Sequence, residues 1–119
     1  MDIWKHGKYA DLWSVVHFLS GFLLGASFFA LDYTFLSALI ASTILLLLWE
    51  VFEWIIKIAE PSINVAMDMI IGLAGFFVAA YIYYFLHAPF EMLYFSIILT
   101  VTLLLSLWGF FDFLKKGYR

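Results

Sequence analysis

The sequence predicts an all-α polytopic membrane protein, a four-transmembrane-helix bundle with both termini in the cytoplasm. Hydrophobic residues make up 66% of the 119 residues and charged residues only 13%, which is too little polar surface for a soluble domain of this size. The chain contains four apolar stretches, each with the roughly 20 residues that cross the hydrocarbon of a bilayer. Little sequence is left between them, so residues 1–119 are predicted to form a single membrane domain.

The first predicted helix covers residues 12–31 and the second covers residues 35–58. Lys5 and Lys8 precede the first apolar run, as basic residues precede the apolar part of a signal peptide. We expect this run to stay in the protein as a helix of the bundle, because its histidine and glycines match polar and small residues of the other helices. The second helix ends before Pro61, since proline lacks an N–H group and disrupts a helix interior.

The third predicted helix covers residues 63–86 and the fourth covers residues 90–114. Ser62 or Asn64 is expected to cap the start of the third helix with its side-chain oxygen. Asp112 lies in the last turn of the fourth helix, and lysines follow it three and four residues later. That is the spacing of an ion pair within a helix.

The basic residues predict the orientation in the membrane. All of them fall on one side of a topology with four crossings: Lys5, Lys8, Lys57, Lys115, Lys116 and Arg119. Cytoplasmic loops near helix ends carry an excess of Lys and Arg, so this side is predicted to be the cytoplasmic side of a prokaryotic inner membrane. Interfacial tryptophans are expected at the same side: Trp4, Trp13 and Trp54.

Composition also limits the partners. Membrane lipids are the expected partners, and a bundle this small can also pair as a homodimer. The net charge of −3 predicts no nucleic-acid partner. The chain has no cysteine, which excludes disulfides and thiolate sites.

Polar residues inside the apolar stretches converge on one layer in the cytoplasmic half of the membrane. At about 1.5 Å per helical residue, His17 lies about one and a half turns into the first helix. Glu50 and Glu53 lie a similar distance from the inner end of the second helix, which runs in the opposite direction. Asp68 lies near the start of the third helix and Asp112 near the end of the fourth. All four helices therefore bring a polar group to one depth.

Helical spacing places these groups on the same faces as small residues. The stripe on the second helix carries Glu50, Glu53, Lys57 and Glu60, and that on the third carries Asn64, Asp68, Gly72 and Gly75. The stripe on the first helix carries His17, Gly21 and Gly25, and such a GxxxG pair allows close approach of a neighbouring helix. We expect the first and third helices to touch along their glycines, which brings His17 and Asp68 together. The short second loop adds the acids of the second helix.

Ordinary structural roles compete with a functional one for several of these residues. Glu53 can pair with Lys57 one turn later, and Asp68 can stabilise the positive end of the third helix. Glu60 lies in a turn, at the rim of the predicted site. Glu50 has no such partner in the sequence, and an ionisable residue inside a membrane segment indicates a functional site. Four residues are predicted to surround the site and contact a substrate: Asn64, Lys57, Glu60 and Asp112.

Three chemistries suit the predicted cluster. A divalent cation can be held by His17, Glu50, Glu53 and Asp68, since nitrogen and carboxylate oxygen ligands suit Mg, Mn, Fe or Zn. The carboxylates can instead share protons, as a proton or cation relay requires. Alternatively, His17 and one of the carboxylates can form an acid and base pair that faces a lipid head group.

The polar residues follow one another in an order that is found in a known family. They are Asp11, His17, Glu50, Glu53, Asp68, Gly72 and Gly75. In this order they resemble the VanZ-like small membrane proteins and their uncharacterised relatives, over about residues 11–75. The family usually has Gln where this chain has Glu53 and Asn where it has Gly72. The resemblance implies a role in the cell envelope, where the family is linked to glycopeptide resistance.

The sequence therefore favours a small inner-membrane protein that binds a divalent cation and acts on a lipid or lipid-linked envelope substrate. Its catalytic residues would be Glu50, His17 and Asp68. A first alternative is an oligomeric proton or cation transporter that uses the same carboxylates. A second is a non-catalytic interaction module, in which Gly21 and Gly25 pair with a helix of another protein.

Overall fold

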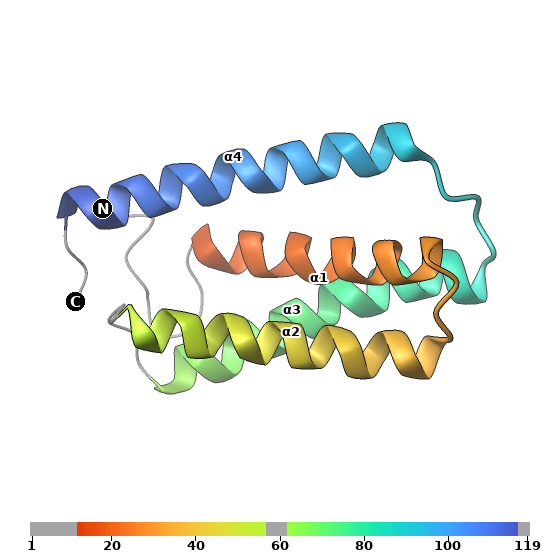
Figure 1. Cartoon of the computed structure of the whole chain (residues 1–119), viewed down its shortest axis with the longest axis horizontal. Coiled ribbons are helices and arrows are strands. Elements are labelled where there is room, and N and C mark those ends of the chain that lie inside the picture. Colours follow the sequence, from red (N-terminus) through yellow and green to blue (C-terminus); the bar gives the residue numbers. More distant parts are fainter. Residues whose placement is uncertain (1–11, 57–61, 117–119) are drawn as a thin grey trace.

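The computed structural model describes residues 12–56 and 62–116, which form an all-helical bundle (Figure 1). The long helices are α1 (Leu12–Ala30), α2 (Phe35–Ile55), α3 (Ser62–Ala80) and α4 (Met92–Lys116), and a short π-helix, η1 (Tyr81–Phe85), continues α3. The described chain has four helical spans that are long and apolar enough to cross a membrane, with α3 and η1 forming one of them. The predicted all-α class and four-helix architecture are confirmed.

The helix boundaries differ from the predicted ones by a few residues. The second helix ends at Ile55, and the predicted end at residue 58 lies outside the described residues. The third predicted helix is divided, because its last turn widens into the π-helix, where the N–H of Leu86 bonds to the carbonyl of Tyr81 at 2.9 Å. Pro89 follows closely and disfavours helical backbone at the residue before it. The fourth helix then begins at Met92.

The loop between α1 and α2 is a tight turn. Asp32 adopts a φ of 65°, in the left-handed region that Asp and Asn tolerate better than most residues. Thr34 then caps α2, because its side-chain oxygen accepts the N–H of Ser37 at 3.2 Å. This turn makes α1 and α2 antiparallel neighbours.

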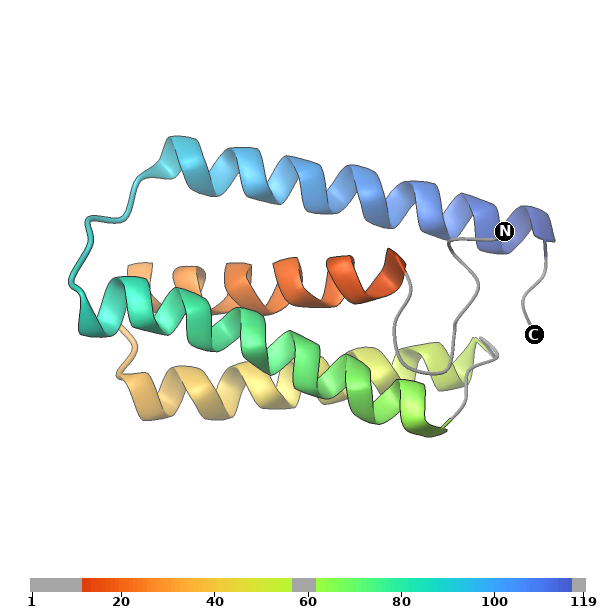
Figure 2. The same cartoon turned by 180° about the vertical axis from the view of Figure 1, so that it is seen from behind.

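Helices α1 and α3 form the centre of the bundle, and their backbones touch at glycines. A Cβ added to Gly21 would meet the carbonyl of Gly72, and one added to Gly75 would meet the carbonyl of Phe18. Figure 2 shows α3 running along α1 from behind. Glycine allows this approach because it places no side chain between two helices. The predicted contact between the glycine stripes is therefore present.

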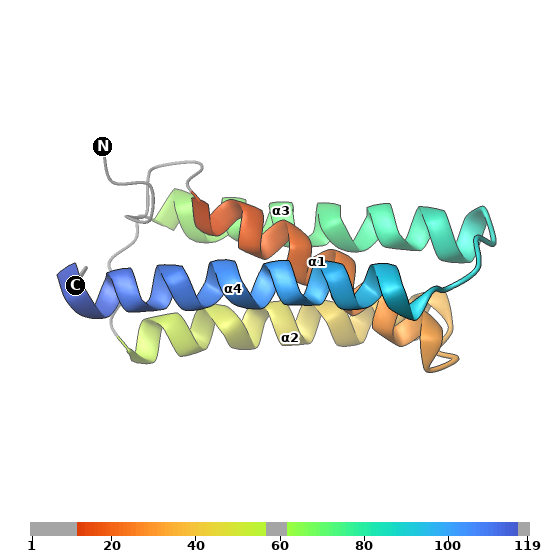
Figure 3. The same ribbon diagram turned by 90° about the horizontal axis from the view of Figure 1, so that it is seen from above.

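Helices α2 and α4 join this central pair through side chains. Leu46 of α2 fills the space beside Gly72, and Ala38 joins a buried cluster with Phe76 and Ala80 of α3. Helix α4 packs against α1, as Figure 3 shows from above. Much of the surface of α2 and α4 is apolar and exposed, as expected for helices that face lipid.

The two ends of the bundle differ in polarity. At the Leu12 end, α1 begins, α2 ends, α3 begins and α4 ends (Figure 1). At the opposite end, the Phe35 end, aromatic rings pack around the loops, and the hydroxyl of Tyr84 donates to the carbonyl of Tyr33 at 2.8 Å. Buried charged side chains of the described residues lie toward the Leu12 end: His17, Glu50, Glu53 and Asp68.

The glycine contact predicts a strong effect of small substitutions. Gly21→Ala and Gly75→Ala each place a methyl group against a backbone carbonyl that cannot rotate away. We expect each to destabilise the bundle by at least the 1–3 kcal/mol, roughly, of an overpacked core. Unfolding in detergent followed by circular dichroism measures the loss. Ala74→Leu, on the exposed face of α3, is the matched control and should change stability little; equal stability of all three variants would contradict the glycine contact.

Candidate functional site

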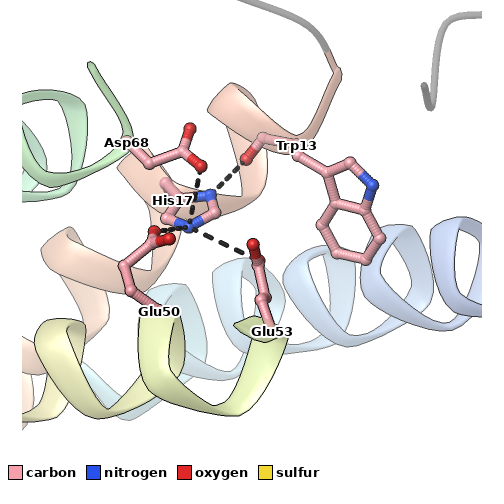
Figure 4. Close-up of polar contacts among 5 residues, drawn as sticks. All are labelled: Trp13, His17, Glu50, Glu53 and Asp68. Atoms are coloured by element: carbon pink, nitrogen blue, oxygen red, sulfur yellow. Dashed lines mark hydrogen bonds and ion pairs between the residues drawn. The ribbon is translucent and has the colours of Figure 1, made fainter. Parts of the chain in front are cut away.

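The site is built around His17, which lies on α1 about one and a half turns from Leu12. Its Nδ1 lies 2.8 Å from the carbonyl oxygen of Trp13, one turn earlier in the helix. A carbonyl can only accept a hydrogen bond, so Nδ1 carries a proton and donates it. This bond orients the ring and turns Nε2 away from α1, toward α2 and α3 (Figure 4).

Three carboxylates from two other helices face this nitrogen. His17 Nε2 lies 3.2 Å from Glu50 Oε1, 3.6 Å from Asp68 Oδ2 and 4.0 Å from Glu53 Oε1. Figure 4 shows all three carboxylates pointing toward the imidazole. The exposed fraction is 3% for His17, 9% for Glu50, 1% for Glu53 and 0% for Asp68. The structure thus brings together the four residues that the sequence analysis placed in one cluster.

Helical spacing explains how the backbone positions these side chains. His17 lies four residues before Gly21, and Asp68 lies four residues before Gly72. Because residues four apart share a helix face, the glycine contact between α1 and α3 sets His17 beside Asp68. On α2, Leu46 is buried one turn from Glu50 and directs that face of the helix toward the same place.

Apolar side chains cover the site on the side of α4. Trp13 and Val16 are buried in a cluster with Leu12, Trp49 and Leu105. The ring of Trp49 stands edge-on to the ring of His17, with centroids 6.4 Å apart. Surroundings of this kind keep water out and strengthen the electrostatic interactions of the charges they enclose.

The charges of the cluster require compensation. Burying several carboxylates close together is costly, because each loses hydration and repels the others. The second oxygen of Glu50, Oε2, is buried and has no hydrogen-bond partner among the described residues. A protonated His17 offers one positive charge, and Nε2 is its only ring nitrogen that faces the acids. A bound cation or additional protons would reduce the repulsion that remains.

The donor atoms are close enough to share one ion. His17, Glu50 and Asp68 each offer a ligand atom, and these atoms lie within 4.8 Å of one another. Ligand atoms around one tetrahedral cation lie roughly 3.4 Å apart when each bond is about 2.1 Å. Small side-chain rotations would therefore bring these donors to a cation. Glu53, with its nearest oxygen 4.0 Å from Nε2, lies beside this set of three.

The structure describes only some of the other predicted site residues. Lys57 and Glu60 lie outside the described residues, as do Asp11 and the side chain of Asn64. Asp112 is half-buried in the last turn of α4 and does not belong to the set of three ligand atoms.

Two tryptophans have roles that the sequence analysis missed. Only 3% of Trp13 is exposed, because its ring packs with Trp49 of α2 and Leu105 of α4. Its carbonyl also accepts the hydrogen bond that orients His17. Its position four residues before His17 was the available signal, since that spacing suits a bond from side chain to backbone. Trp49 precedes Glu50 directly and covers the imidazole; nothing in its position in the sequence indicated this contact.

The bond to Trp13 predicts the protonation state of His17. We expect Nδ1 to carry a proton in every state of the site, because the carbonyl of Trp13 lies 2.8 Å away and can only accept. Nitrogen NMR of protein labelled at histidine measures this directly, with His17→Gln to assign the signal. The exposed His87 is the internal reference signal in the same spectrum. A His17 ring protonated at Nε2 alone would contradict the geometry.

Comparisons with known proteins offer no relative from which a role could be transferred. No model of a protein family, no curated protein and no solved structure matches the chain. The resemblance to the VanZ-like proteins stays a prediction that rests on the order of a few polar residues.

Proposed function

We propose that this chain is a small integral protein of the prokaryotic cytoplasmic membrane that binds a divalent cation and acts on a lipid or lipid-linked envelope substrate. One observation carries the proposal: the Nε2 atom of His17 faces three buried carboxylates from two other helices, at 3.2 to 4.0 Å. The cation would be held by His17, Glu50 and Asp68, with Glu53 beside them.

The orientation of His17 supports a cation over shared protons alone. Histidines that bind metals usually donate their second ring N–H to a carbonyl or carboxylate, which fixes the ring and makes the other nitrogen a better ligand. His17 makes this bond to Trp13. One imidazole nitrogen and several carboxylate oxygens suit Mg, Mn, Fe or Zn. A divalent ion would also relieve the repulsion among the acids more effectively than one proton.

The depth of the site supports a substrate with a head group. His17 lies about one and a half turns from the Leu12 end, so the site lies just inside the membrane surface. A cation there can polarise a phosphate or carbonyl oxygen or activate a water molecule. Lys115 is exposed in the last turn of α4 and would attract an anionic head group. The resemblance to the VanZ-like proteins adds the expectation of an envelope lipid.

A transport pathway within one chain has less support. Beyond Glu50 on the buried face of α2, the next polar side chain is Ser42, two turns deeper. Nearer the Phe35 end, Ala38, Phe76 and Ala80 form a buried apolar cluster, against which further aromatic rings pack. A conducting path needs polar groups or water along its length. The oligomeric proton or cation transporter therefore stays an alternative that would require residues from another copy.

An interaction module based on the GxxxG pair has less support as well. Gly21 and Gly25 face α3 of the same chain, at Gly72, Phe76 and Ala79. They are covered inside the bundle and cannot also receive a helix of another protein on that face.

The first test is the metal content of the purified protein. We expect about one divalent ion per chain after gentle purification, measured by mass spectrometry of the elements. His17→Ala and Glu50→Gln each remove one ligand, so each should lower the affinity at least about tenfold, as even the loss of an outer partner does. Glu91→Gln is the matched control, because Glu91 is an exposed acid near the Phe35 end. Protein free of metal under every gentle preparation, and unable to take up Zn²⁺, Mn²⁺ or Mg²⁺, would refute the proposal.

The orientation is tested with a reporter. We expect a fluorescent protein that folds only in the cytoplasm to be fluorescent when fused after Arg119, since all basic residues lie on that side of the predicted topology. The same reporter inserted after His87, in the loop before α4, serves as the control and should stay dark. The reverse pattern would place the cluster near the outer surface instead.

A further inference from the structure

We propose that the occupancy of the cation site controls whether the half of α2 nearest the Leu12 end stays docked on α1 and α3. The inference rests on the proposed cation site and adds a moving element to it. With the ion bound, this half of α2 closes the site. Without the ion it swings outward and opens the site toward the Leu12 end.

The two halves of α2 are attached by different forces. From Phe35 to Leu46 the helix buries Ala38, Ser42 and Leu46 against the bundle. From residue 47 to residue 55 the buried residues are Glu50 and Glu53. Their neighbours on this half are exposed, among them Val51, Trp54 and Ile55, and only Trp49 adds a partly buried apolar contact. The half of α2 from Phe35 to Leu46 is therefore held by apolar packing, and the half from residue 47 to residue 55 is held mainly by its two acids.

The rest of the site cannot open in this way. Gly21 lies against the backbone of Gly72, and Gly75 lies against the backbone of Phe18. Separating α1 from α3 would break backbone packing along the central contact of the bundle. Helix α2 has no glycine between Phe35 and Ile55, and from residue 47 to residue 55 Trp49 is its only partly buried apolar residue. Among the helices that carry the cluster, α2 is therefore the one that can move.

Electrostatics couples this movement to the ion. Glu50 and Glu53 of α2 and Asp68 of α3 all face the imidazole of His17. A bound cation attracts the acids of both helices and draws α2 inward. Without it the like charges repel, and the buried Oε2 of Glu50, which has no hydrogen-bond partner in the described part of the chain, gains hydration when α2 moves out.

Access to the site requires a movement of this kind. His17, Glu53 and Asp68 are each at most 3% exposed, so neither an ion nor a head group reaches them in the closed arrangement. An outward swing of α2 exposes all three together. The same movement that loads the cation therefore admits the substrate of the proposed reaction.

Spin-label distances test the proposal, because the chain has no native cysteine. We place one label pair at Ile55 and Ile70, on exposed positions of α2 and α3 toward the Leu12 end. The control pair is Leu36 and Val78, on exposed positions of the same helices toward the Phe35 end. Electron paramagnetic resonance then compares protein in lipid nanodiscs with excess Zn²⁺ and with chelator. We expect the first distribution to become longer and broader in chelator and the second to stay the same.

The variants distinguish this inference from the proposed function. Glu50→Gln, made in the labelled protein, should lose the response to Zn²⁺, whereas Glu91→Gln should keep it. The zinc content of the same samples is measured beside the distances. Stoichiometric zinc with identical distances in zinc and chelator would overturn the moving helix and leave the cation site standing. Absence of bound zinc together with unchanged distances would overturn both.

Discussion

The close contact between the backbones of α1 and α3 is the constraint on which the rest of the structure depends. It exists because Gly21 and Gly75 leave no side chains between the two helices. One turn along the same helix faces, this contact places the imidazole of His17 beside the carboxylate of Asp68. Neither group could otherwise be tolerated in an apolar bundle. The polar site is therefore a consequence of a packing feature that itself contains no polar side chain.

Much of this arrangement could be predicted from the sequence, because membrane helices follow simple rules. Length and hydropathy give four helices, and the spacing of His17, Asp68 and the glycines gives one shared face. The rest depended on information that spacing does not carry. No spacing in the sequence marks the π-helix η1, and the burial of Trp13 depends on its packing with Trp49 of α2 and Leu105 of α4. Sequence periodicity assigns faces to helices, but it does not say which neighbour covers a given face.

The orientation of the His17 ring is fixed, although burying the charged groups around it costs free energy. Its Nδ1 is bound to a carbonyl within its own helix, so the orientation of the ring does not depend on α2 or α3. The acids then come to a ring that is already oriented. Such preorganisation keeps the donors near the geometry that a ligand needs. Two of the three acids lie on α2, whose only buried residues from residue 47 to residue 55 are these two acids.

The apolar cluster of Ala38, Phe76 and Ala80 lies between the site around His17 and the Phe35 end of the bundle. In the proposed orientation this cluster would separate the site from the outer leaflet, so the proposed chemistry would be confined to the inner leaflet. A lipid whose head group lies in the outer leaflet would first have to be turned over before it could reach His17. The rate of the proposed reaction would then depend on how fast lipid is turned over into the inner leaflet, as well as on the protein's own turnover rate.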